Sequence, residues 1–193
     1  HVQRALFAVD RLVQGELIQL GNRRNATVTP ETALQVCSLK TGALMRLAAE
    51  LGVSTAGGSS DKAVKLGLAF EHLGVAFQIT DDLLDLSGNA ALLGKAVGAD
   101  VKHGTISYPL ALALHQRPEL ARDLAAAFVK DAPEEVLGAV ARRALDGSDA
   151  LDLAAQTVDR ELAASLGVVG DLPPSRARTI LLAVCAAMGQ RSA

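Results

Sequence analysis

Three aspartates, Asp81, Asp82 and Asp85, stand close together at the end of an apolar segment. Side chains three and four residues apart share one face of a helix, so these carboxylates and Gln78 form a polar stripe. The stripe is unfavourable by itself, because like charges repel and the helix dipole disfavours anions at a C-terminal end. A divalent cation removes both penalties, and all-oxygen ligands favour Mg²⁺, which commonly bridges carboxylates to substrate phosphates. The alternative is a solvated helix end that carries surface charge.

Two lysines offer positive charge that suits a phosphate group. Lys95 follows the aspartates and stands between Gly94 and Gly98, and glycines let the backbone come close to a ligand. Lys40, next to Thr41, interrupts a mostly apolar run. Taken alone, Lys95 has the alternative of a surface loop residue, and Lys40 that of a side chain that snorkels to water. The position of Lys95 directly after the aspartates favours a role in binding.

Helices must position these residues, because apolar residues recur at helical spacing and no stretch shows sustained alternation of period two. Thr29 and Pro30 are typical of the start of a helix, and Gly21 and Gly52 of its end. Residues 87–106 are predicted to be irregular, and a loop of that length is usually functional. Helices are expected over residues 1–20, 30–51, 60–86, 107–116, 118–131, 134–146, 149–166 and 175–190.

The composition limits the possible classes of protein. The 193 residues suffice for one domain, and we predict a single all-α domain over residues 1–193 with a core of Ala, Leu and Val. A net charge of −2 and 3% aromatic residues argue against a nucleic-acid partner. The longest apolar run, Ile180–Met188, is too short for a transmembrane segment, and no signal peptide is recognised, so we expect a cytoplasmic protein. Cys37 and Cys185 are expected to be buried free thiols.

Taken together, these segments resemble the trans-prenyl diphosphate synthases, also called polyprenyl synthetases. The resemblance extends over essentially the whole chain and is strongest over residues 36–110. The combination of Phe-Gln, Asp-Asp-x-x-Asp and a following Gly-Lys is specific, since class I terpene cyclases share the aspartate motif but not the lysine loop. The matching residues are Gly15-Glu16 with Gln19, Leu39-Lys40-Thr41-Gly42, Gly74 to Asp85, Gly94-Lys95, Gly98-Ala99-Asp100, Gly104 and Pro109-Leu110.

The resemblance implies an all-α helical bundle around a deep central cavity. It also implies a Mg²⁺-dependent prenyltransferase that condenses isopentenyl diphosphate with an allylic diphosphate through an allylic carbocation. Asp81, Asp82 and Asp85 would then form the second aspartate-rich motif, which holds Mg²⁺ against the allylic diphosphate. Physical chemistry agrees, because metal and lysine charges stabilise a departing diphosphate and a dry cavity protects the cation.

The resemblance further implies roles for residues around the motif. Lys40 and Lys95 would contact the same diphosphate. Thr41 and Gln78 would lie near the developing allylic cation, which hydroxyl and carbonyl dipoles stabilise. Phe77 would lie beside the isopentenyl tail.

The chain departs from the family pattern in two ways. No second Asp-Asp-x-x-Asp is present, so the resemblance implies a C-terminal portion that lacks the N-terminal helices and the first aspartate-rich motif. Such a chain is expected to have little or no activity by itself. Thr105 stands where many members carry a lysine, and Lys102, about one turn earlier, would partly substitute as a substrate contact.

Other functions stay open on the sequence alone. The chain would be either a prenyltransferase, or a non-catalytic or regulatory subunit of a heteromeric prenyl diphosphate synthase, or a metal-binding helical module. The resemblance implies a homodimer or a heterodimer. Residues 1–20 and 107–131 offer apolar helices for such an association.

Overall fold

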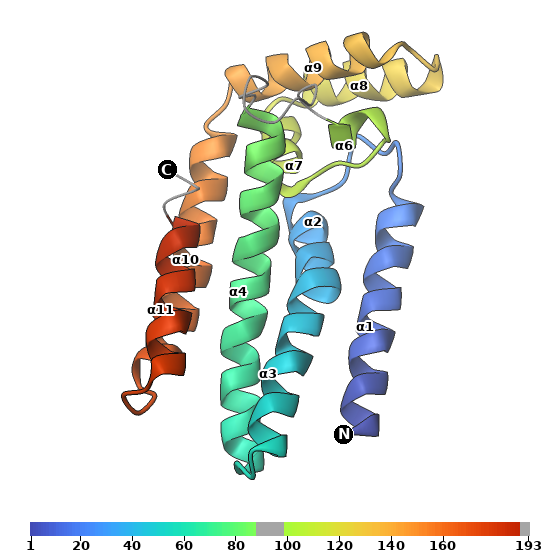
Figure 1. The fold of residues 1–193 in the computed structure, drawn as a ribbon. Coiled ribbons are helices and arrows are strands. Elements are labelled where there is room, and N and C mark those ends of the chain that lie inside the picture. Colours follow the sequence, from blue (N-terminus) through green and yellow to red (C-terminus); the bar gives the residue numbers. More distant parts are fainter. Residues whose placement is uncertain (88–98, 190–193) are drawn as a thin grey trace.

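Helices account for most of the described chain, residues 1–87 and 99–189, in the computed structural model (Figure 1). No β-strand occurs within these residues, and the predicted all-α class is confirmed. The elements in chain order are α1 (Val2–Gly21), α2 (Pro30–Cys37), the π-helical turn η1 (Ser38–Gly42), α3 (Ala43–Thr55), α4 (Ser60–Ser87), α6 (Ala99–Lys102), α7 (Tyr108–Gln116), α8 (Pro118–Val129), α9 (Glu134–Asp146), α10 (Ala150–Gly170) and α11 (Arg176–Gly189).

The observed helices differ from the predicted ones in a few places. The helix predicted over residues 30–51 contains a π-helical turn and continues past Gly52 to Thr55. In this extension the hydroxyls of Ser54 and Thr55 donate hydrogen bonds to backbone carbonyls one turn earlier, at 2.7 and 2.8 Å. α10 also runs beyond its predicted end, to Gly170. Within the segment predicted as irregular, the structure describes the short helix α6.

α4 is the central helix of the bundle. It packs against α3 on one side and α10 on another (Figure 1). α4 also lies close to η1 at Gly74, where an added Cβ would lie 2.8 Å from the Cα of Gly42. The buried apolar residues of α4 are small or aliphatic: Ala63, Ala69, Leu73, Val75, Ala76, Ile79, Leu83 and Leu86. Small side chains let neighbouring helices approach closely, so α4 is held firmly along much of its length.

The remaining helices surround this centre. α1 runs beside η1 and α3, and α11 packs against α10. α7, α8 and α9 gather at the end of the bundle where α4 finishes (Figure 1). The aspartates near the end of α4 therefore lie close to α7. In the part of the chain described, no helix combines the length and the apolar character needed to cross a membrane.

Candidate active site

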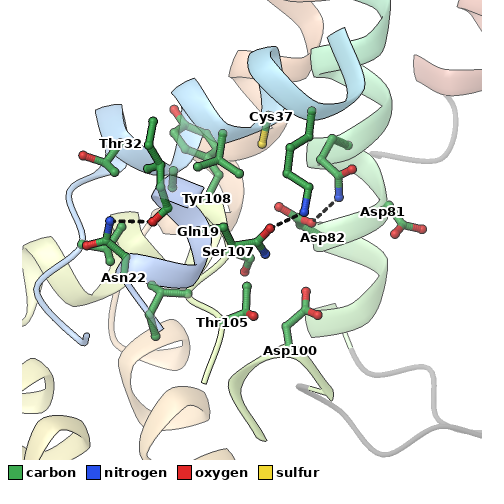
Figure 2. A pocket seen from close by; sticks show the side chains of 17 residues that line it. Gln19, Asn22, Thr32, Cys37, Asp81, Asp82, Asp100, Thr105, Ser107 and Tyr108 are labelled. Atoms are coloured by element: carbon green, nitrogen blue, oxygen red, sulfur yellow. Dashed lines mark hydrogen bonds between the residues drawn. The ribbon is translucent and has the colours of Figure 1, made fainter. Parts of the chain in front are cut away.

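A pocket of about 190 Å³ opens beside the last turns of α4. Residues of α1, α2, η1, α4 and the segment from α6 to α7 line it (Figure 2). Four of the predicted site residues are among them, namely Lys40, Gln78, Asp81 and Asp82. Another part of the wall comes from Asp100, Thr105, Ser107 and Tyr108. The pocket thus collects polar side chains from segments far apart in the sequence.

Lys40 reaches the pocket from η1, and two side chains of α1 hold its amino group. Nζ of Lys40 lies 2.5 Å from Oε2 of Glu16. It also donates a hydrogen bond to Oε1 of Gln19, a labelled residue in Figure 2. The close approach of α1 depends on Gly15, where an added Cβ would lie 2.8 Å from Cγ of Lys40. These contacts orient the ammonium group within the pocket.

A chain of hydrogen bonds links η1 to α4. Oγ1 of Thr41 donates to Oε1 of Gln78 at 2.8 Å, and Nε2 of Gln78 donates to Oδ1 of Asp82 at 3.0 Å. The two bonds fix the amide of Gln78, with its oxygen towards Thr41 and its nitrogen towards Asp82. The structure therefore brings three of the predicted site residues into direct contact.

Asp82 is the most buried of the three aspartates, with 6% of its surface exposed. Burial raises the pKa of Asp82 to about 7, and the negative charges of Asp100 and Asp81 act in the same direction. Hydrogen bonds from Gln78 and from the backbone N–H of Tyr108 oppose this rise. Tyr108 begins α7, so a helix N-terminus faces the carboxylate. A cation bound beside Asp82 would favour its ionised form.

The three aspartates do not share one environment, which differs from the single stripe predicted from their spacing. Asp82 is buried in the pocket, Asp81 is exposed, and Asp85 is partly buried outside the pocket lining. Asp81 and Asp82 are adjacent, so their side chains point about 100° apart around the axis, and the packing of other elements against α4 decides which of them is buried. Figure 2 shows the carboxylates of Asp81 and Asp82 diverging from α4.

The carboxylate oxygens on α4 are candidate ligands for Mg²⁺. Oδ2 of Asp85 is buried, and no described residue donates a hydrogen bond to it, which is costly unless a ligand satisfies the atom. Over residues 1–87 and 99–189, no three Asp, Glu, His or Cys side chains converge closely enough to hold an ion alone. Mg²⁺ is usually held by one or two carboxylates together with water and substrate phosphates. The donors therefore fit Mg²⁺ as partners of a diphosphate and not as a complete protein cage.

Apart from Thr41 and Asp85, three predicted site residues are also not part of the described pocket lining. Phe77 is 46% exposed and lies on α4 one turn before Asp81. Lys102 ends α6 and pairs with Glu134 of α9 at 3.2 Å. Lys95 lies outside the described residues. The roles predicted for these three residues stay predictions.

Two residues of the pocket wall, Asp100 and Tyr108, had no predicted role. Figure 2 shows the carboxylate of Asp100 turned towards Asp82. The hydroxyl of Tyr108 hydrogen bonds to Oγ1 of Thr157 in α10 at 3.1 Å, which ties the start of α7 to the core. The sequence carries one sign that Asp100 belongs to the site, because Asp100 lies in a segment that matches the family. Tyr108 belongs to no motif, and the sequence distinguishes it only as the single tyrosine of the chain.

The loop between α1 and α2 supports the same wall. The backbone N–H of Arg24 donates to the carbonyl of Gly104 at 2.7 Å, and Nε of Arg23 donates to the carbonyl of His103 at 2.7 Å. Gly104 has a φ of 80°, and an added Cβ would lie 2.6 Å from Cγ of Arg24. Glycine is therefore required where the chain turns from α6 towards Thr105.

Comparison with known proteins identifies related sequences and folds. A family model described as polyprenyl synthetase matches residues 3–142. Farnesyl diphosphate synthase from Escherichia coli (strain K12) is 41% identical over 122 residues, which cover 63% of this chain and 39% of that protein. Octaprenyl diphosphate synthase from the same strain is 30% identical over 185 residues, which cover 95% of this chain and 57% of that protein. This chain thus spans about half the length of the curated relatives that it matches.

The fold has solved counterparts. The crystal structure of heptaprenyl diphosphate synthase from Staphylococcus aureus matches with a TM-score of 0.88 at 26% sequence identity. The match covers 99% of this chain and 59% of that one. The helical arrangement described above is therefore that of prenyl diphosphate synthases.

Proposed function

Because the chain belongs to the polyprenyl synthetase family, we propose that it acts in a prenyltransferase that condenses isopentenyl diphosphate with an allylic diphosphate. One observation carries the proposal: a single pocket collects Lys40 from η1 and Asp81 and Asp82 from α4. An ammonium group together with carboxylates suits a metal-bound diphosphate, because the metal ion bridges an anionic ligand to an anionic protein surface. The related farnesyl and octaprenyl diphosphate synthases belong to the same reaction class.

In this proposal, the charged residues bind and activate the diphosphate. Asp81, Asp82 and Asp85 would hold Mg²⁺, whose charge stabilises a departing diphosphate. Lys40 binds the same group with the ammonium that Glu16 and Gln19 orient. We propose that Lys95 also contacts the diphosphate. We propose a weaker contact for Lys102, because its ion pair with Glu134 competes with binding to the diphosphate.

The uncharged polar residues would serve the carbocation. The carbonyl oxygen of Gln78 accepts one hydrogen bond from Thr41 and keeps a second lone pair for a positive centre. A fixed dipole of this kind stabilises developing charge without reorganisation at the moment of reaction. Phe77 shares a helix face with Asp81 and would lie beside the tail of the isopentenyl diphosphate.

A second candidate function is that of a subunit that works with a partner chain. It is favoured by α1, where half-exposed or exposed apolar residues recur every three or four positions along one face. These residues are Val2, Leu6, Val9, Val13, Leu17 and Leu20. A homodimer or a heterodimer would cover them, and the subunit would then bind substrate only with its partner.

Calorimetric titration separates these candidates. We expect the chain to bind farnesyl thiodiphosphate, a stable analogue of an allylic substrate, only when Mg²⁺ is present. The reason is that the carboxylates of the pocket repel the diphosphate unless a cation stands between them. Affinity for Mg²⁺ without affinity for the analogue would favour a metal-binding module. Absence of both would favour the subunit that requires a partner.

Activity of the chain alone is a separate matter. The sequence holds one Asp-Asp-x-x-Asp, and we expect the purified 193-residue chain to turn over isopentenyl and allylic diphosphates little or not at all. Its carboxylates would hold the allylic diphosphate from one side only. The measurement is incorporation of labelled isopentenyl diphosphate by a preparation of verified intact mass. Sustained turnover by that preparation contradicts the expectation.

A further inference from the structure

Lys40 and Thr41 lie on the π-helical turn η1. The contacts that stabilise this turn therefore determine the positions of both side chains. π-helical turns are rare and are frequently found at functional sites. η1 has α-helical neighbours on both sides, since Cys37 and Ala43 have ordinary α-helical dihedral angles. The turn is therefore a local departure within one continuous helix, and contacts from other helices must maintain it.

The carboxylate of Glu71 on α4 contacts both sides of this turn. Ser38, the first residue of η1, donates a hydrogen bond from Oγ to Oε1 of Glu71 at 2.8 Å. Arg46, one turn after Gly42, donates from Nη1 to Oε2 at 3.1 Å. Arg11 of α1 donates from Nη2 to Oε1 at 2.5 Å. One side chain thus joins α1, the start of η1 and the first turns of α3.

The backbone of α4 also lies directly against the turn. An added Cβ at Gly42 would lie 3.1 Å from Cγ of Glu71 and 3.2 Å from its carbonyl oxygen. An added Cβ at Gly74 would lie 2.8 Å from the Cα of Gly42. The two glycines therefore allow Glu71 to reach under the turn, and the fit leaves little room for the turn to shift.

The charge of Glu71 is preserved at this partly buried position. Burial opposes ionisation, but hydrogen bonds from Arg11, Ser38 and Arg46 outweigh it and lower the pKa of Glu71 to about 2. The side chain of Glu71 is 15% exposed and lines neither the pocket nor its rim. Its negative charge therefore contacts no residue of the pocket directly.

We propose that Glu71 is a positioning residue, which fixes the π-helical turn and thereby sets the reach of Lys40 and Thr41 towards a diphosphate. The part that concerns the diphosphate rests on the function proposed above. Lys40 and Thr41 lie between the two points, Ser38 and Arg46, that the carboxylate holds. Releasing those points frees the turn to take up α-helical geometry, which rotates both side chains about the helix axis.

The first test needs no ligand. Hydrogen–deuterium exchange of the amides of residues 38–42 should be roughly tenfold faster in Glu71→Gln than in the unaltered chain, because local opening becomes easier. Glu161→Gln is the matched control, since Glu161 pairs with the adjacent residue His72 at 2.7 Å but joins α4 to α10. Ser38→Ala is a milder variant that removes a single contact. Equal exchange in η1 for Glu71→Gln and Glu161→Gln would overturn the proposal.

The second test concerns reach and uses Mg²⁺ with inorganic pyrophosphate. Glu71→Gln should weaken binding about tenfold, because small displacements of a binding group are costly, whereas Glu161→Gln should leave it unchanged. In a Lys40→Ala background, Glu71→Gln should add little further loss, since its effect passes through Lys40. Additive losses would overturn the link to Lys40. No binding by the unaltered chain would instead refute the proposed function, and the exchange measurement would still decide whether Glu71 holds the turn.

Discussion

Asp82→Asn should remove most of the Mg²⁺-dependent affinity of the chain for pyrophosphate. The substitution keeps the shape of the side chain and its contact with Gln78, but it deletes the only aspartate charge that is buried in the pocket. We expect a loss of roughly 100-fold, since even indirect changes around a metal site cost 10- to 100-fold. Thr105→Ala is the control, because Thr105 lines the same pocket without charge. Equal losses in the two variants would mean that the cation binds elsewhere.

The same substitution should stabilise the free protein at pH 8. The pKa of Asp82 is raised from 3.8 to about 7, so in that range the native state keeps a proton that the unfolded chain has lost. The stability that comes from this proton is complete below about pH 4 and is lost as the pH rises to about 7. At about 1.4 kcal/mol per pKa unit, Asp82→Asn should raise the free energy of unfolding by up to about 4 kcal/mol at pH 8 and by little at pH 4. Urea unfolding at both pH values measures this difference, and a loss of stability at pH 8 contradicts it.

Gly74→Ala should destabilise the fold by about 2–3 kcal/mol, because a methyl group has no room where α4 meets η1. An ideal Cβ would lie 2.8 Å from the Cα of Gly42 and 2.9 Å from Sδ of Met45. The sulfur can move, but the backbone of Gly42 moves only if the two helices separate. Separation would also withdraw Thr41 from Gln78, so affinity for pyrophosphate should fall together with stability.

Gly138→Ala is the matched control for this prediction. Gly138 is inside α9, and nothing lies within 4 Å of an added Cβ there. Alanine should therefore raise the free energy of unfolding by roughly 0.5–1 kcal/mol through its better helix propensity. Both variants are compared by their midpoints of urea unfolding. If Gly74→Ala were as stable as Gly138→Ala, the conclusion that α4 and η1 leave no room for a methyl group at Gly74 would be wrong.

Much of the fold was predictable because its signals are local. Thr29 accepts a hydrogen bond from the backbone N–H of Thr32, and Pro30 opens α2, as their types indicated. The π-helical turn was not predictable, because Ser38–Gly42 contains nothing that distinguishes it from an α-helical segment. Its geometry depends on contacts with side chains of α4 and α1 that lie more than twenty positions away in the sequence, which a local pattern does not contain.

The candidate site was predictable to a similar degree. Spacing placed Gln78 and Asp82 on one face of α4, and their hydrogen bond confirms that they are neighbours. Spacing did not reveal that Asp81 is exposed while Asp82 is buried, because this depends on where α7 packs. The hydrogen bond from Tyr108 to Asp82 is made by the backbone N–H, so the identity of the side chain gives no sign of it.

The two cysteines are both buried and unpaired, as predicted, and this has a practical consequence. Burial raises the pKa of Cys37, and the nearby charge of Asp82 raises it further; burial also raises the pKa of Cys185. The thiolate is the form that reacts with alkylating reagents, so we expect both sulfurs to react slowly while the helices stay packed. The chain therefore carries two native reporters of its own opening, one at the end of α2 and one in α11. Mass spectrometry after brief alkylation would read which end of the bundle loosens first, without any engineered label.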